Sequence, residues 1–234
     1  MTYFIHREDV QANVRPVAIS YRMLDAQHGC VAGFRCGITV FKSTEYLLEK
    51  GHADQEGFVV LEGTGWAKVG DEEQHVAPGD CFLAPAGVAH GVRRDAGVPH
   101  VKTCWFHGAI GPADASAAGS AKPASYFVKL ADVPGVEGRN TVTHRMLGEA
   151  QGCVYGFSSG IGVYKATEYS IAPQGHADQE GFVVLEGTGW AKMGGEEQRI
   201  GPDDCFVAPA GVLHGIRRDP HVPSVKVCWF HGAI

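Results

Sequence analysis

The sequence predicts an all-β protein built from two barrel or jelly-roll domains, and three observations support this prediction. The eighteen residues from Gly51 to Lys68 recur without change from Gly175 to Lys192. Short runs of branched and aromatic residues alternate with Gly, Pro and Asp, as in strands joined by turns. No apolar stripe with a 3.6-residue period extends over ten residues, which argues against long helices. Many short antiparallel strands per copy of the repeat are typical of a barrel or jelly roll.

The extent of the repeat divides the chain. Paired positions are offset by 123 residues, and by 124 from Gly51 onward, and both copies end with CWFHGAI, at 104–110 and 228–234. The stretch between them, GPADASAAGSAKPAS, has no counterpart and no aromatic residue, which is typical of a linker. We therefore expect an N-terminal domain at residues 1–110, a linker at 111–125 and a C-terminal domain at 126–234.

Identity is uneven along the two copies. Only five of the twenty pairs from Tyr3/Tyr126 to Arg22/Arg145 are identical, whereas all eighteen pairs of the central segment are. Within the first copy we predict strands at 57–62, 65–69, 81–84 and 101–106. The stretch Glu62–Gly65 predicts a hairpin turn, because its two glycines permit the positive φ that such turns require.

Charge and composition exclude several classes of function. The net charge is -6, and no cluster of basic residues is longer than a pair, which argues against nucleic acid or an anionic membrane as a partner. No apolar run approaches the ~20 residues of a membrane helix, and the N-terminus lacks a signal-peptide pattern, so we expect a cytoplasmic protein. The seven cysteines form no CxxC pair, and we interpret them as buried small hydrophobic residues in a reducing cell.

Each copy offers two histidines and a glutamate that could bind a metal. Four residues along a straight strand advance ~13 Å, too far for two side chains to share an ion with bonds of ~2.0 to 2.2 Å. The chain must therefore fold back between the first histidine and the glutamate, and a turn at 53–55 fits better than a helix because Gly51 and Gly57 flank it. The predicted ligands are His52, Glu56 and His90 in copy one, and His176, Glu180 and His214 in copy two.

These residues resemble the two sequence motifs of the cupin family. Gly79-DCFLA-Pro85-Ala-Gly87-Val-Ala-His90 matches the second motif, and copy two departs from it only at Asp203, in place of the leading glycine. The first motif is met in part, because His52 falls on its second histidine and Glu56-x6-Gly63 fits. The resemblance covers both domains and implies a bicupin: two double-stranded β-helix barrels, each with a metal site inside its mouth.

The place of the first cupin histidine differs between the copies. Lys50 occupies it in copy one and Gln174 in copy two. Both are catalytic candidates: Lys50 could act as a base, and Gln174 could be a weak fourth ligand, although an exposed loop position suits glutamine better. A lysine beside the ion would oppose metal binding, so we expect the second site to bind metal better.

Other residues are candidates for substrate binding, each with an alternative. Gln55 and Gln179 lie between the predicted ligands and either hold substrate or face solvent. Alternation along the last strand places Trp105 with His107, and Trp229 with His231, on one face. That face lines a pocket or covers a contact between the barrels. The pairs Arg93-Arg94 and Arg217-Arg218 could bind a carboxylate or lie exposed on a loop.

Two histidines and one carboxylate with open positions are the ligand set of non-haem Fe(II) oxygenases. The spacing also resembles that of the cupin epoxidase acting on hydroxypropylphosphonate. We therefore expect an oxidoreductase of dioxygenase type acting on a small molecule, with an organic acid as a candidate substrate and Fe(II) favoured over Mn, Ni or Zn. A metal-dependent isomerase or lyase on a hydroxy or keto acid is the alternative, as is a binding module without catalysis. The sequence leaves open whether the protein forms a homodimer.

Overall fold

Strands dominate the computed structural model of the chain, which describes residues 2–108, 122–171 and 175–232. Helical structure within these residues is limited to four short 3-10 helices: η1 (Arg7–Asp9), η2 (Ala26–His28), η3 (Leu130–Asp132) and η4 (Glu149–Gln151). The all-β prediction is confirmed. None of the helices in the described part of the chain is long and apolar enough to span a membrane.

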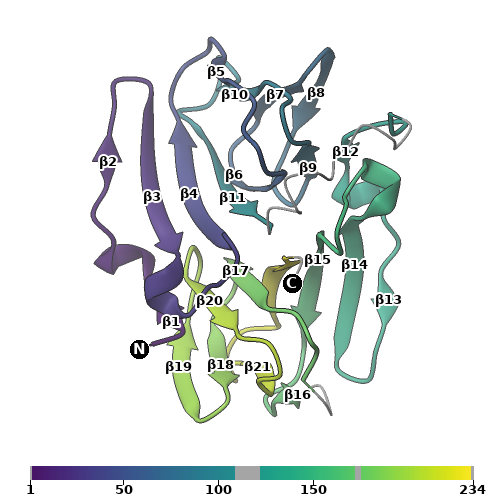
Figure 1. The fold of residues 1–234 in the computed structure, drawn as a ribbon. Helices are drawn as coiled ribbons and strands as arrows, with labels where there is room; N and C mark the ends of the chain where they lie inside the picture. The colour runs from purple at the N-terminus through teal and green to yellow at the C-terminus, as the bar shows by residue number, and fades with distance from the viewer. Residues whose placement is uncertain (1, 109–121, 172–174, 233–234) are drawn as a thin grey trace.

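The first half forms a large and a small antiparallel sheet, which together make one barrel (Figure 1). The large sheet has the order β12 (Phe127–Val128), β9 (Cys81–Ala84), β6 (Glu56–Glu62), β11 (Val101–His107), β4 (Arg35–Phe41), β3 (Ala18–Leu24) and β2 (Asn13–Val14). The small sheet has the order β5 (Leu47–Glu49), β10 (His90–Arg94), β7 (Gly65–Val69) and β8 (Glu72–Val76).

The second half repeats this arrangement with the corresponding strands. Its large sheet has the order β1 (Phe4–Ile5), β20 (Cys205–Ala208), β17 (Glu180–Glu186), β22 (Val225–His231), β15 (Ser158–Tyr164), β14 (Thr141–Leu147) and β13 (Val136–Glu137). Its small sheet has the order β16 (Ser170–Ile171), β21 (His214–Arg218), β18 (Gly189–Met193) and β19 (Glu196–Ile200).

The two halves exchange their first strands. Phe4 of β1 pairs with Phe206 in the second barrel, and Phe127 of β12 pairs with Phe82 in the first. Each exchanged phenylalanine stacks on its partner, with ring centroids 5.6 and 5.5 Å apart. Each barrel is therefore completed by a strand from the other half of the chain. The boundaries predicted at 110 and 126 stay a prediction, and most of the predicted linker lies outside the described residues.

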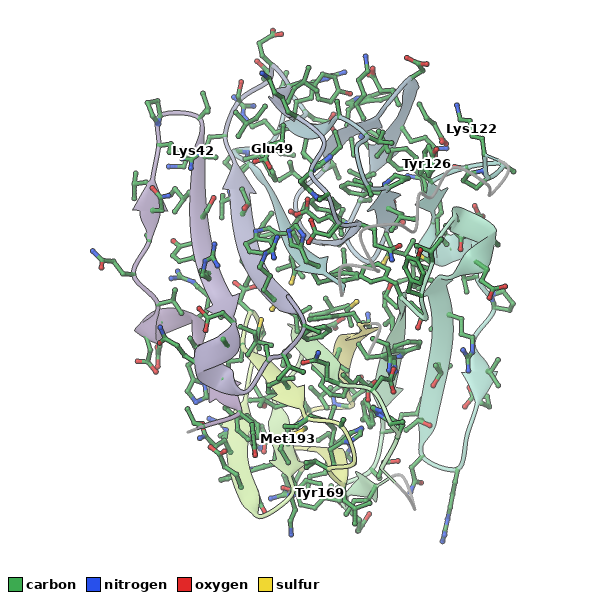
Figure 2. The ribbon with its side chains drawn as sticks, viewed as in Figure 1. Lys42, Glu49, Lys122, Tyr126, Tyr169 and Met193 are labelled. Atoms are coloured by element: carbon green, nitrogen blue, oxygen red, sulfur yellow. The ribbon has the colours of Figure 1, made fainter. Side chains whose placement is uncertain are left out.

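Alternation along the large sheets gives each one two apolar faces. On β11, Trp105 packs against the interior of the first barrel, whereas Cys104 and Phe106 belong to a core shared by both halves. Phe106 stacks on Phe230 of the other half at 4.5 Å. Figure 2 shows side chains filling the space between the two halves. The barrels are thus joined by a hydrophobic core between their large sheets.

Most of the predicted strands are observed, but one connection differs. The predicted hairpin at Glu62–Gly65 is wrong, because β6 and β7 belong to different sheets. The turn is a corner that carries the chain from one sheet to the other. Gly63 has φ +74°, and a Cβ there would lie 2.1 Å from the carbonyl oxygen of His100, so the corner requires glycine.

Candidate metal centres

Three histidines surround Glu56 in the first barrel. The Nε2 atoms of His52 and His90 lie 2.9 and 3.0 Å from Oε2 of Glu56, and Nε2 of His107 lies 3.3 Å from Oε1. Glu56 is 5% exposed, and His90 and His107 are buried as well. One ligand atom each from His52, Glu56 and His90 fall within 4.8 Å of one another. Such a group of nitrogen and carboxylate donors could hold a divalent transition ion.

The backbone brings these side chains together as the turn prediction requires. A bend at Ala53 and Asp54 separates His52 from β6, which begins at Glu56. The N–H of Gly87 donates to the carbonyl of His52 at 2.7 Å, joining the two motif loops. A Cβ on Gly51 would lie 2.1 Å from the backbone of Gly87, so the close approach of these loops depends on glycine.

The other ring nitrogen of each histidine faces an oxygen acceptor. Nδ1 of His52 and Nδ1 of His107 each lie 2.8 Å from the carboxylate of Asp54, and Nδ1 of His90 lies 3.0 Å from the carbonyl of Val88. Metal-binding histidines characteristically donate their second N–H in this way, which fixes the ring and leaves Nε2 for the ion. The arrangement therefore fits a metal centre in donor type and in orientation.

Electrostatics in the metal-free cluster favour a cation. Burial alone would raise the pKa of Glu56, but hydrogen bonds from His107, His52 and His90 outweigh it and hold that pKa well below its ordinary value. Hydrogen bonds to Asp54, and then to Glu56, raise the pKa of His52 to about 10. The carboxylates thus stay ionised and hold protons on the rings, and a cation would displace these protons.

The second barrel repeats the cluster. The Nε2 atoms of His176, His214 and His231 lie 3.0, 2.9 and 3.4 Å from the carboxylate of Glu180. Asp178 again holds two of the rings, with Nδ1 of His176 at 2.8 Å and Nδ1 of His231 at 2.6 Å. Hydrogen bonding to Glu180 raises the pKa of His176 to about 9. His176, Glu180 and His214 also form a group that could bind a metal.

The histidine at the end of each last strand is the residue whose role the sequence interpretation missed. From the sequence, His107 and His231 either line a pocket or belong to a contact between the barrels, whereas the structure brings them to Glu56 and Glu180. In the β11–β6 pair His107 lies directly opposite Glu56. The signal was available, because the string Cys-Trp-Phe-His occurs in both copies and alternation puts the histidine on the interior face.

The residues at the vacant motif position do not join the clusters. Lys50 is exposed and is not among the residues lining the pocket of the first barrel. Its predicted role as a base therefore has no support from its position. Gln174 lies outside the described residues.

The two glutamines have a different role from the predicted one. The side-chain amide of Gln55 donates to the carbonyl of Val154 at 2.8 Å and accepts from its N–H at 3.2 Å. Gln179 makes the same pair of bonds to Val31, at 2.8 and 3.1 Å. The structure does not support substrate binding by these residues, because the N–H and the oxygen of each buried side-chain amide are both hydrogen-bonded to the backbone of the other half. They tie the barrels together.

The arginine pairs also serve the fold. The guanidinium of Arg93 stacks over the ring of Trp66 at 5.4 Å, and that of Arg94 donates to carbonyls of its own loop, including Val98 at 2.8 Å. In the second half Arg217 stacks over Tyr169, which Figure 2 labels, at 5.2 Å. The alternative of a carboxylate site at these pairs is thus not supported.

A pocket of about 560 Å³ opens onto the first cluster. Besides Glu56 and the three histidines, its lining includes Trp105. Of the two alternatives for the face of the last strand that carries Trp105 and His107, this agrees with a pocket wall. Three basic side chains also line it: Arg15, Arg22 and Arg35. Arg35 donates to the carboxylate of Asp54 at 3.2 Å, which connects the basic wall to the cluster.

Described residues of the second barrel also line a pocket beside its cluster. A pocket of about 240 Å³ is lined by His214 and by Tyr164, among others. Tyr164 stands where the first barrel has Phe41, and a Cβ on Gly162 would lie 3.0 Å from its ring. Burial, with a smaller contribution from the charge of Glu180, raises the pKa of Tyr164. The ring of Tyr164 thus lies near Glu180. It occupies space that is open because Gly162 has no side chain.

Comparison with known proteins agrees with this architecture. A model of the cupin domain matches residues 39–105 and 160–230. A search of curated proteins finds no match. Among solved structures, a formate complex of Lactobacillus farciminis oxalate decarboxylase is similar with a TM-score of 0.79 at 11% identity, covering 100% of this chain and 87% of that one. A mutant of Bacillus subtilis oxalate decarboxylase has a TM-score of 0.78 at 11% identity, covering 100% and 78%. A study of the Mn(II) centers of that enzyme gives a structure with the same values. At such low identity these likenesses show the fold alone.

Proposed function

Because the chain belongs to the cupin family, and carries the cupin domain twice, we propose that it is a metal-dependent enzyme acting on a small organic acid in its first barrel. One observation carries the proposal. The cluster around Glu56 and three arginines line the same pocket of about 560 Å³. A donor set for a cation beside a basic wall suits a substrate that places one oxygen on the metal and its charge on the arginines.

We propose that His52, Glu56, His90 and His107 hold the ion, with Mn(II) and Fe(II) as the preferred ions. When bound, the ion supplies Lewis acidity that polarises a carbonyl or carboxylate oxygen of the substrate. Asp54 keeps His52 and His107 oriented by accepting from their Nδ1 atoms.

The remaining residues of the pocket bind and shield the substrate. Arg35 is half-buried and fixed by Asp54, so its free N–H groups can receive a carboxylate. Trp105 and Phe58 form apolar parts of the lining, which exclude water from the reacting centre. Glu49 on β5, labelled in Figure 2, is a further carboxylate of the lining and can accept or return a proton.

The reaction we propose is lyase or isomerase chemistry on a hydroxy or keto acid. The basic wall favours it, and so does Glu49, which lines the same pocket and lies directly opposite His90 in the β10–β5 pair. The structural neighbours are oxalate decarboxylases, one of them bound to formate, which agrees with this class. An oxygenase is the second candidate, favoured by the histidine and glutamate donors, which also occur in non-haem iron oxygenases.

Metal analysis and an oxygen electrode test this proposal. Protein purified without chelator is expected to contain a divalent transition metal and to convert at least one of a panel of hydroxy and keto acids without oxygen uptake. Conversion that requires and consumes oxygen would favour the oxygenase instead. Protein that binds no more than traces of any divalent transition ion would contradict both and leave a binding function.

A further inference from the structure

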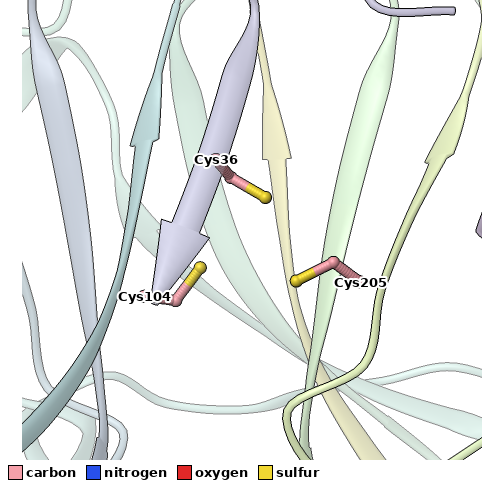
Figure 3. A group of neighbouring side chains, drawn as sticks. All are labelled: Cys36, Cys104 and Cys205. Carbon is pink, nitrogen blue, oxygen red and sulfur yellow. The ribbon is translucent and has the colours of Figure 1, made fainter. Parts of the chain in front are cut away.

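A second cluster of potential metal ligands lies between the barrels, away from both histidine sites. Cys36 of β4 and Cys104 of β11 come from the first half, and Cys205 of β20 comes from the second. Their Sγ atoms all lie within 4.8 Å of one another. Figure 3 shows the three side chains directed toward a common centre.

The surroundings of these sulfurs are apolar. All three cysteines are buried, with exposures of 0%, 0% and 1%, and they belong to the core shared by both halves. None of the seven cysteines forms a disulfide. The three thiols were interpreted above as small hydrophobic residues, and burial agrees with that, but hydrophobicity alone does not account for three sulfurs meeting at one point.

We propose that Cys36, Cys104 and Cys205 form a binding site for one soft ion in trigonal three-sulfur coordination. Metal–sulfur bonds of about 2.3 Å place three sulfurs around a central ion roughly 4 Å apart, so adjustments of under about an ångström close the site. No histidine or carboxylate among the described residues joins the group, which disfavours zinc because structural zinc takes four ligands. Soft thiolate ligands instead select soft ions.

The apolar core favours an ion that leaves the site uncharged. Three thiolates around Cu(I) carry a net charge of minus two, which is costly to bury without a partner. Trivalent arsenic gives a neutral site: three As–O bonds of As(OH)₃ and three S–H bonds break, three As–S bonds form, and three water molecules leave. Arsenic stays trivalent, so no oxidant or reductant is needed. We therefore expect arsenite to bind more tightly than Cu(I).

The bound ion would join the barrels. Two sulfurs come from the large sheet of the first half and one from the large sheet of the second. A central ion therefore bridges the interface that Gln55 and Gln179 already tie by hydrogen bonds. The site is a structural staple between the domains and does not depend on the enzyme function proposed above.

The internal repeat provides a matched control. The positions equivalent to Cys36, Cys104 and Cys205 are Ser159, Cys228 and Cys81. Cys81 lies within interaction distance of both Cys228 and Ser159, so the second group has the same arrangement with one sulfur replaced by oxygen. Ser159 is fully buried, and its hydroxyl has no hydrogen-bond partner in the described structure. Serine is therefore tolerated at this position, and the second group has only two sulfurs.

Native mass spectrometry on the reduced full chain, after removal of divalent metals by chelation, tests the site. With arsenite we expect one arsenic per chain in the wild type, none in Cys36→Ser and two in Ser159→Cys. A parallel titration with Cu(I) under anaerobic conditions measures the preference between the two ions. X-ray absorption of the arsenic complex is expected to show three sulfur neighbours.

Several results would overturn the proposal. These are a wild type that binds neither ion, a folded Cys36→Ser variant that keeps its ion, or a Ser159→Cys variant that gains none. The last variant decides the question even if Cys36→Ser fails to fold, because it adds a sulfur without removing one. In separate samples purified without chelator, divalent metal bound by the histidine sites is expected to be equal in all three proteins, which separates this result from any failure of the proposed enzyme function.

Discussion

The two barrels share a cluster and differ in the walls around it. Each has a central glutamate met by three Nε2 atoms, with an aspartate behind two of the rings. The walls formed by β4 and β15 differ at three facing positions: Arg35 against Ser158, Thr39 against Gly162 and Phe41 against Tyr164. Among the described residues, three arginines line a pocket of about 560 Å³ beside the first cluster, and a pocket of about 240 Å³ lies beside the second. This difference shows that two sites with the same potential metal ligands need not be equivalent.

The comparison also bears on one expectation about metal binding, which stays a prediction. Lys50 was expected to weaken the first site, yet Lys50 is exposed and the first cluster is the more buried of the two. The side chain of Asp54 is 5% exposed, whereas that of its counterpart Asp178 is 27% exposed. Because the first cluster is the more buried and arginines line its pocket, we assign the chemistry to the first barrel and expect the second to bind metal without turnover.

Removing the central glutamate from one barrel at a time gives the largest expected difference. In Glu56→Gln the first ion and all activity are expected to be lost, because the carboxylate that faces three histidines is neutralised. Glu180→Gln is expected to lose one ion as well but to keep activity. Metal analysis measures the loss of an ion in each variant, and the acid-conversion assay measures the remaining activity. If Glu180→Gln is inactive while Glu56→Gln works, the assignment of the barrels is reversed.

Exchanging the arginine for its counterpart sharpens the comparison. Arg35→Ser gives the first barrel the residue of the second, and we expect KM to rise about 10- to 100-fold, as for loss of a hydrogen bond to a charged group. Metal content is expected to stay unchanged, which separates a substrate role from damage to the cluster. Ser158→Arg serves as the control in the other barrel and is expected to leave KM as it is. An unchanged KM in Arg35→Ser would remove the basis for an acidic substrate.

The pH dependence of metal binding distinguishes the barrels more finely. A raised histidine pKa means that the proton is bound below that pH and must leave when the ion binds. Affinity is therefore expected to rise with pH, by up to roughly tenfold per unit for each proton released. The rise is expected to continue to about pH 10 through His52 and to about pH 9 through His176. Calorimetry of Glu180→Gln and Glu56→Gln in buffers of different ionisation enthalpy measures each barrel alone, and equal proton release at every pH would contradict the difference.

The contact between the barrels is where we expect them to behave alike. Gln55→Ala and Gln179→Ala each remove two hydrogen bonds between the halves, to the backbone of Val154 and of Val31. Each is expected to lower the free energy of unfolding by about 1 to 3 kcal/mol. Urea denaturation checks this, with metal content as the control. A loss in only one variant would show that the tie between the halves is asymmetric.

Much of this architecture could be predicted from the sequence, because alternation and turn residues are local signals. They predict β7 and β9 with their observed ends, and the spacing His-x3-Glu predicts the bend at Ala53. The partner of a strand is not a local signal. A corner between sheets and a hairpin turn need the same glycines, so the sequence around Gly63 does not distinguish them. Strand β1 has only two residues, which is too few to predict that it pairs in the other barrel.

The metal-ligating residues of the site could be predicted from the sequence more completely than the residues around them. His52, Glu56 and His90 follow from motif spacing, whereas His107 reaches Glu56 only through the pairing of β11 with β6. The low identity between the first segments of the two copies was a further signal. Arg15 lies in such a segment and Gly138 replaces it, so the divergence falls partly on the pocket wall.

A crystal structure of the metal-loaded protein with a saturating small carboxylic acid tests the central claim most directly. Anomalous data are expected to show one ion in each barrel, held by the three histidines and the glutamate. The acid is expected beside Arg35 in the first barrel and to be absent from the second. An acid bound in the second barrel only, or ions away from both glutamates, would contradict this account.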